Sequence, residues 1–312
     1  MEIKESYQYG GWNNCIMVSD RKIKLVIVTD VGPRIISFGA TNGKNMFKEF
    51  KESLGSTGGE DWVPYGGHRL WHAPEASPRS YYPDNSEVDY KIEGNTVILS
   101  QKTETTTGIK KEMEITLFED NSFVEVIHRI INENIWAIEA APWAITMMAE
   151  NTRAIIPHEP FQSWNENLLP VNSVNLWAYT KMADPRFKWQ DKYIQLKQDS
   201  SIPSRQKVGV ASRQCWIAGA NNDDLMIKRF FRFPFAVYPD LGSNIEAYTD
   251  EDIIEMETLG SMELIEPGEY LEHTEYWFYF NTMLGEDEDS LDKNLKPLID
   301  ETENMLYKTN ER

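Results

Sequence analysis

The chain has 312 residues, of which 50 are acidic and 31 are basic, so its formal charge is −19 at neutral pH. Binding to nucleic acid or to an anionic membrane surface requires a basic stripe that displaces counterions, and the sequence contains none. Apolar residues make up 41% of the chain and aromatic residues 12%, which is enough for a large packed core and excludes wholesale disorder.

The first residues lack the charged start and apolar run of a signal peptide, and no stretch approaches the roughly 18 apolar residues of a membrane span. We therefore expect a cytoplasmic protein. Cys15 and Cys215 are the only cysteines, too few for a disulfide framework. The two cysteines are in no metal-type spacing, so we expect no metal, and the lack of a glycine-rich phosphate loop leads us to expect no cofactor.

Apolar and polar residues alternate along many short segments, which is the pattern of half-buried β-strands. In chain order, residues 23–29 and 34–38 flank a turn and predict one strand pair, and residues 111–118 and 123–131 predict a β-hairpin. Further short strands are predicted at 97–101, 143–148, 153–156, 208–211, 225–229, 244–249, 253–259 and 270–280.

Helical spacing is scarce before residue 285. Leu291, Leu295, Leu298 and Ile299 follow it in the acidic tail, where Pro297 should start or kink a helix. Many short strands separated by turns are typical of a sandwich or barrel. The sequence thus predicts an all-β fold with one antiparallel domain over residues 1–284, followed by a short acidic tail, 285–312, that is helical.

The segment 65–75 contains His68, Arg69, Trp71, His72 and Glu75 behind a Gly-Gly pair. The two histidines are four residues apart, which places them on the same face of either a helix or a strand. A metal site would need a third ligand, and the His-Glu-x-x-His pattern is absent. Two interpretations stay open: hydrogen-bonded structural histidines with Trp71 in the core, or a pocket floor where imidazole, guanidinium and carboxylate converge on a polyhydroxylated ligand.

A second concentration of polar residues is the segment 244–259. Glu255 and Glu257 lie two apart, so in a strand they share a face. Two carboxylates at this distance repel each other, and one of them can acquire a raised pKa that suits a general acid or base. The alternative is an ordinary solvated sheet face.

Several short motifs together resemble the galactose mutarotase-like superfamily, which includes the aldose 1-epimerases. They are GPRIISF at 32–38, GGHRLW at 66–71, Tyr248-Thr249, LIEPGEY at 264–270 and TEYW at 274–277. The similarity spans roughly residues 10 to 280. It implies a large β-supersandwich of two antiparallel sheets, with a sugar site on the concave sheet.

The resemblance also implies an activity, the interconversion of sugar anomers by a general base and a general acid. The family base is a Glu that precedes a Pro-Gly segment, which matches Glu255 best and Glu257 next. The family acid is a His on a mid-chain strand, and residues 143–148 contain none. We therefore expect His68 or His72 to supply the acid, with Glu255, Glu257 and His68 as the catalytic set. The expected sugar-binding residues are Arg34, Arg69, Trp71, His72, Glu75 and Trp143.

Two other functions remain open at this point. A non-catalytic carbohydrate-binding module on the same fold would explain the absent strand His. A polysaccharide lyase or glycoside hydrolase relative would use a related sandwich domain. In each case the expected partner is a small-molecule sugar, and the chain is expected to be a monomer or a homodimer.

Overall fold

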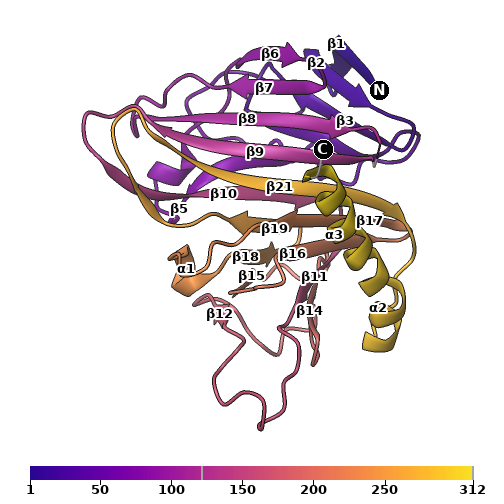
Figure 1. Ribbon diagram of the computed structural model, residues 1–312. Coiled ribbons are helices and arrows are strands. Elements are labelled where there is room, and N and C mark those ends of the chain that lie inside the picture. Colours follow the sequence, from indigo (N-terminus) through magenta and orange to yellow (C-terminus); the bar gives the residue numbers. More distant parts are fainter. Residues whose placement is uncertain (121, 311–312) are drawn as a thin grey trace.

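The regular structure consists almost entirely of antiparallel β-strands arranged in two sheets (Figure 1). A computed structural model describes residues 1–120 and 122–310. Residues 311 and 312 of the predicted tail lie outside the described part of the chain. The two sheets pack face to face and enclose the main core, so the predicted all-β sandwich is confirmed.

The first sheet has eleven strands, and the order of its neighbours departs from the order of the chain. From one edge to the other they are β1 (Glu2–Tyr9), β2 (Trp12–Ser19), β3 (Ile23–Val28), β4 (Arg34–Ala40), β5 (His68–Ala73), β10 (Ile138–Met148), β19 (Ile254–Leu259), β18 (Ile245–Thr249), β15 (Gln206–Val210) and β12 (Val174–Leu176), with β20 (Glu263–Ile265) pairing beside the start of β10.

The second sheet has ten strands and includes the longest one, β21. Their order is β13 (Phe187–Trp189), β14 (Tyr193–Lys197), β11 (Arg153–Pro157), β16 (Trp216–Asn221), β17 (Asp224–Phe230), β21 (Tyr270–Asn281), β9 (Phe123–Asn132), β8 (Ile109–Phe118), β7 (Thr96–Ser100) and β6 (Asp89–Glu93). The predicted hairpins form as β3–β4 and β8–β9.

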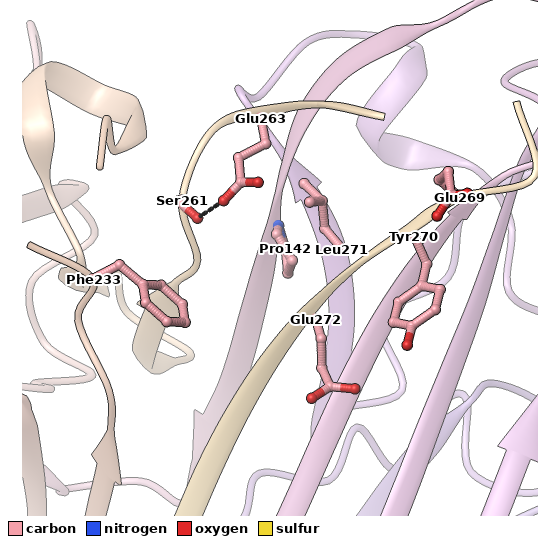
Figure 2. A pocket seen from close by; sticks show the side chains of 8 residues that line it. All are labelled: Pro142, Phe233, Ser261, Glu263, Glu269, Tyr270, Leu271 and Glu272. Carbon is pink, nitrogen blue, oxygen red and sulfur yellow. Dashed lines mark hydrogen bonds between the residues drawn. The ribbon is translucent and has the colours of Figure 1, made fainter. Parts of the chain in front are cut away.

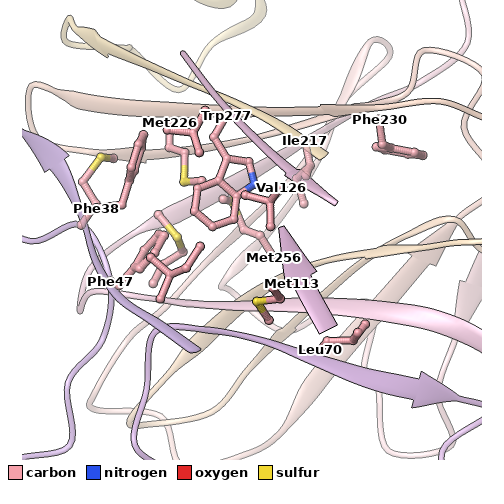
Figure 3. Packing of buried hydrophobic residues seen from close by; sticks show 14 of the residues in the cluster. Phe38, Phe47, Leu70, Met113, Val126, Ile217, Met226, Phe230, Met256 and Trp277 are labelled. Atoms are coloured by element: carbon pink, nitrogen blue, oxygen red, sulfur yellow. The ribbon is translucent and has the colours of Figure 1, made fainter. Parts of the chain in front are cut away.

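Each sheet has an inner face toward the other sheet and an outer face. The inner faces bury one continuous apolar cluster that includes Phe38, Met113, Met256 and Trp277 (Figure 3). Because successive strand residues point to opposite faces, each strand of the first sheet also presents residues to the outer face. A separate cluster that includes Trp71, Trp143 and Leu259 packs there.

A glycine sets the position at which β5 joins the first sheet. Gly67 has φ +69, in the left-handed region that glycine tolerates best, and a Cβ at this residue would lie 2.3 Å from the backbone oxygen of Ile35. Any larger residue would push β5 away from β4. The Gly-Gly pair seen in the sequence therefore places His68 and Arg69 in register with their neighbours.

The tail is helical and covers the outer face of the second sheet. Its helices are α2 (Glu288–Asn294) and α3 (Lys296–Asn310) (Figure 1). Tyr193 of β14 donates a hydrogen bond to Asp292 of α2 at 3.1 Å, and Arg229 of β17 donates one to the backbone oxygen of Ile299 of α3 at 2.7 Å. Leu291, Leu295 and Ile299 are buried in a cluster with Phe278. The side chain of Asp287 accepts a hydrogen bond from Ser290 N and caps α2.

Two short helical segments complete the described elements, a 3₁₀ turn (Arg79–Tyr81) and α1 (Pro239–Gly242). Among the described residues, no helix is both long enough and apolar enough to cross a membrane.

Candidate functional site

The register of three neighbouring strands brings the predicted site residues of the early and late segments together. Trp71 on β5 lies opposite Trp143 on β10, and Ile145 on β10 lies opposite both Arg69 and Glu257. Directly paired residues project to the same face of a sheet. The side chains of Arg69, Trp71, Trp143, Glu255 and Glu257 therefore share the outer face of the first sheet, where aromatic contacts join the tryptophans, with ring centroids 5.5 Å apart.

The two predicted histidines lie on the other face. His68 and His72 alternate with Arg69 and Trp71 along β5, so they point into the core between the sheets, and both are fully buried. His68 Nδ1 is 2.8 Å from Thr146 Oγ1, and its Nε2 is 2.7 Å from His128 Nε2. The expected convergence of imidazole with guanidinium and carboxylate therefore does not form, because adjacent strand residues cannot share a face.

The inner histidines belong to a buried polar network that spans both sheets. Lys228 Nζ lies 2.6 Å from Glu275 Oε1, and the other oxygen of Glu275 accepts a hydrogen bond from Trp277 Nε1 at 2.8 Å. Burial, together with the nearby His128 and Lys228, holds the pKa of His68 well below its usual value, so His68 is neutral. Burial likewise lowers the pKa of His72 to about 2.

Three members of this network have the residue types of a metal site. One donor atom each from His68, His128 and Glu275 lies within 4.8 Å of the others. These residues do not favour a metal cation, because the Lys228 ammonium already forms an ion pair with the Glu275 carboxylate. The imidazoles of His68 and His128 are in turn hydrogen-bonded to each other. We assign this cluster a structural role.

On the outer face, Arg69 lies between aromatic rings and has free hydrogen-bond donors. Its guanidinium carbon is 4.6 Å from the centre of the Trp71 ring and 5.5 Å from that of Trp62. Arg69 Nη2 is 3.3 Å from Glu255 Oε1. Its Nε and Nη1 are buried and have no partner, which is costly unless a ligand or water accepts these hydrogen bonds. This corner of the site is therefore suited to a ligand oxygen.

Beside it lies a group of two carboxylates and one ammonium. Lys207 Nζ on β15 is 2.7 Å from Glu246 Oε2 on β18 and 2.8 Å from Glu257 Oε2 on β19. Trp143 Nε1 donates a hydrogen bond to the same oxygen of Glu257 at 2.6 Å. The other oxygen of Glu257, Oε1, is buried without a partner. Glu257 thus has one oxygen held in place and one free.

The burial of this group shifts its protonation equilibria. Burial and the charge of Glu257 raise the pKa of Glu255 to about 7, although Arg69 opposes the shift. Burial and the charges of Glu257 and Asp240 raise the pKa of Glu246 well above its usual value, and Lys207 opposes this. Burial alone would lower the pKa of Lys207, but the two glutamates outweigh it and raise the pKa.

Aromatic side chains from three loops cover the site. Lys207 Nζ lies 4.8 Å from the centre of the Trp177 ring, and Thr180, three residues later, donates a hydrogen bond to the backbone oxygen of Lys207. Tyr81 packs against Trp71 with ring centroids 4.9 Å apart. As a result Glu246 and Glu257 are inaccessible, while Glu255 keeps 9% of its surface exposed. The open side of the site lies at Glu255.

Two other predicted binding residues, Arg34 and Glu75, lie at the edge of the candidate site. Arg34 lies opposite Arg69, but it is fully buried, donates to Gly66 O and pairs with Asp84 at 2.5 Å, so it supports the loop rather than facing the site. Glu75 is exposed and accepts a hydrogen bond from Tyr81 Oη. Glu75 therefore reaches the site through Tyr81.

Two cavities lie outside this site. The larger has a volume of about 420 Å³ and lies beside Pro142 of β10 (Figure 2). Its other lining residues are Phe233, Ser261, Glu263, Glu269, Tyr270, Leu271 and Glu272. The other, of about 340 Å³, lies near Arg79 and Trp136. Neither cavity is lined by Glu246, Glu255 or Glu257.

The sequence interpretation missed Glu246, Lys207, Trp62 and Trp177. The alternation of Glu246 with Ile245 and Ala247 was a usable signal, since it places Glu246 and Tyr248 on the same face of a predicted strand. Lys207 directly precedes a predicted strand, and nothing in its neighbourhood indicates that its partners lie about 40 and 50 residues later in the chain. Such pairings depend on the order of strands in the sheet.

Comparison with known proteins finds similar structures and no similar sequences. No protein-family model matches the chain, and no curated protein matches it. A TPR-domain containing protein from Parabacteroides distasonis has a TM-score of 0.58 at 14% identity over 87% of this chain, which spans 48% of that longer chain.

Two further structures are similar over almost their whole length. A galactose mutarotase-like protein from Lactobacillus casei has a TM-score of 0.54 at 10% identity, covering 85% of this chain and 100% of its own. Another, from Clostridium acetobutylicum, has a TM-score of 0.54 at 11% identity, covering 90% and 99%. The chain therefore has the galactose mutarotase-like fold, as the sequence motifs implied.

Proposed function

We propose that this chain binds a sugar on the outer face of the first sheet and interconverts its α and β anomers. The observation that carries the proposal is the shared face of Arg69, Trp71, Trp143, Glu255 and Glu257, set by the pairing of β5, β10 and β19. An aromatic floor, free donors and two carboxylates are what a polyhydroxylated ligand and acid–base chemistry require.

Glu257 is proposed as the general base. Trp143 and Lys207 hold one of its oxygens, so the carboxylate cannot rotate freely, and the free Oε1 can accept the proton of the anomeric hydroxyl. The Lys207 ammonium, 2.8 Å from Glu257 Oε2, also fixes the orientation of the carboxylate toward the site.

Glu255 is proposed as the general acid in place of the family's strand histidine. Burial raises the pKa of Glu255 to about 7, so this carboxyl can hold a proton near neutral pH and donate it to the ring oxygen. The ring then opens to the aldehyde. Rotation about the bond next to the carbonyl precedes ring closure, in which the two protons return along the same routes and both carboxyl groups recover their starting states.

Arg69 and Trp71 are proposed to bind the sugar. Arg69 offers two unpartnered N–H groups beside Glu255, and the Trp71 ring lies beneath them. A ligand hydroxyl at this point would satisfy donors that are otherwise buried without partners, which favours binding.

Binding without turnover is the second candidate, and the cover over the site favours it. Glu257 is inaccessible beneath Lys207 and Trp177, so a sugar must displace that cover to reach it. A carbohydrate-binding protein would use only the open side of the site at Arg69 and Glu255.

The test is the rate at which freshly dissolved aldoses reach anomeric equilibrium, followed by polarimetry. We expect the wild type to accelerate equilibration of at least one of a panel of common aldoses. The substitution Glu257→Gln should lower the rate acceleration by a factor of about 10² to 10⁴. Glu263→Gln, at the unrelated cavity, serves as the matched control and should keep it. Calorimetric binding without acceleration would support the second candidate, and neither binding nor acceleration would refute both.

A further inference from the structure

Two neighbouring segments expose most of the large apolar side chains that lie on the surface. Residues 158–186, between β11 and β14, and residues 231–242, between β17 and β18, together form what we call the apolar end. Among the described residues, ten of the sixteen large apolar side chains that are more than half exposed lie on it: Phe161, Trp164, Leu168, Leu169, Met182, Phe231, Phe233, Phe235, Val237 and Leu241.

Hydrogen bonds tie the two segments to the same end of the molecule. Asn175 Nδ2 donates to the backbone oxygen of Asp240 at 3.1 Å and to Ser243 Oγ at 2.9 Å. Glu159 accepts a hydrogen bond from Arg213 N at 2.6 Å. Cys215 follows two residues later and lies beside Arg232, which opposes the rise that burial causes in the pKa of the Cys215 thiol. In Figure 1 the loop before β12 extends beyond both sheets on the side of α1.

The area of the apolar end is that of a protein interface. Aromatic side chains bury about 150–250 Å² each when they are covered, so five exposed aromatic and five aliphatic side chains present on the order of 1,000 Å². The largest apolar patch on a typical monomer is about 300–600 Å², whereas a stable dimer buries about 800 Å² per partner. The summed exposed apolar area of the two segments is thus of the size that a stable dimer buries per partner.

Its charge distinguishes it from the rest of the molecule. The two segments contain four acidic and three basic residues, a net of −1, whereas the whole chain carries −19. Two copies of a protein with this negative charge repel each other, and the repulsion is weakest between surfaces that are themselves nearly neutral, such as the apolar end. A basic partner would instead be attracted to the acidic faces. We therefore propose that the apolar end binds a second copy of this chain in a two-fold symmetric dimer.

One residue and the rim of one recess give the proposed interface its centre. Phe235 is fully exposed and has φ +67, a backbone conformation that an aromatic residue rarely adopts without compensation. Phe233, two residues earlier, lines the 420 Å³ cavity opposite Tyr270 (Figure 2). Because Glu263, Glu269 and Glu272 also line that cavity, we place the symmetric contact on Phe233 and Phe235 at its rim and not inside it.

Sedimentation equilibrium with the full chain tests this proposal. We expect the wild type to be a dimer at micromolar concentration and the double variant Phe161→Glu/Phe235→Glu to be monomeric, because a central aromatic anchor typically contributes a factor of about 30 or more to the dissociation constant. Both side chains are exposed in the single chain, so the variant should fold, and circular dichroism checks this. Tyr90→Glu, at an exposed residue of β6 on the opposite edge of the second sheet from β13, is the matched control and should stay dimeric.

Three results would overturn the proposal. The first is a wild type that remains monomeric at about 100 μM, well above the Kd of a standard-size interface. The second is a double variant that remains dimeric. The third is a control variant that dissociates as much as the double variant, since that would indicate a general effect of added charge.

Discussion

Removing Lys207 tests whether two glutamates are sealed beneath the aromatic cover. The substitution Lys207→Met keeps the length of the side chain and removes the ammonium that lies 2.7 Å from Glu246 and 2.8 Å from Glu257. All three groups are buried, and breaking a buried ion pair by deleting one partner typically costs about 3–5 kcal/mol. Because two carboxylates lose the same partner, we expect a loss of about 4 kcal/mol at pH 8.

The loss should depend on pH in a defined direction. Burial already raises the folded-state pKa of Glu246 above its unfolded value, and Lys207 opposes this shift, so removing the ammonium raises that pKa further. The folded variant then binds more protons than the unfolded chain, so its stability falls as pH rises from the unfolded value through the folded one. The deficit relative to wild type should therefore shrink toward pH 5.

Urea unfolding of wild type and variant at several pH values measures both effects. The double variant Lys207→Met/Glu246→Gln removes one of the orphaned charges and should recover about 2 kcal/mol. Lys188→Met, at an exposed lysine, is the control and should change the free energy of unfolding by less than about 0.5 kcal/mol. A loss below about 1 kcal/mol for Lys207→Met, with no pH dependence, would show that water reaches these carboxylates.

Three further predictions concern the acid, the inner network and the tail. If Glu255 is the general acid, the wild-type anomerisation rate falls as pH rises through about 7, and Glu255→Gln gives a low, pH-independent rate by polarimetry; an unchanged profile in the variant would assign the acid elsewhere. Lys228→Met leaves Glu275 buried and unpaired and should cost about 3–5 kcal/mol in urea unfolding, and a cost below about 1 kcal/mol would contradict the sealed network. Leu291→Ala should cost about 2–4 kcal/mol, also by urea unfolding, since Leu291 is fully buried; no effect would mean that the tail does not pack on the sheet.

The fold was predictable because its pattern is local. Alternation with period two identifies strands such as β8 and β9 from their own residues, and the turn between them sets their register. The pairing of the early and late segments, by contrast, came from the family resemblance. Neither alternation nor turns indicate that β10 lies between β5 and β19.

The candidate site was predictable only in part. Glu255 and Glu257 share a face because they are two apart in one strand. The histidines of the segment 65–75 were expected to converge with Arg69, but neighbours in a strand alternate between faces, so His68 and His72 point away from Arg69. Lys207 and Glu246 meet Glu257 through cross-strand pairing, which depends on the strand order of the whole sheet.

The most direct test of the sugar site is NMR of the indole N–H groups in ¹⁵N-tryptophan-labelled protein. The chain has 10 tryptophans, and the signals can be assigned by Trp→Phe variants. Titration with an aldose should shift the signals of Trp62, Trp71 and Trp143, which line the outer face, and leave those of the exposed Trp136 and Trp164 unchanged. Shifts confined to Trp136 or Trp164, or no shift with any aldose, would contradict a sugar site on this face.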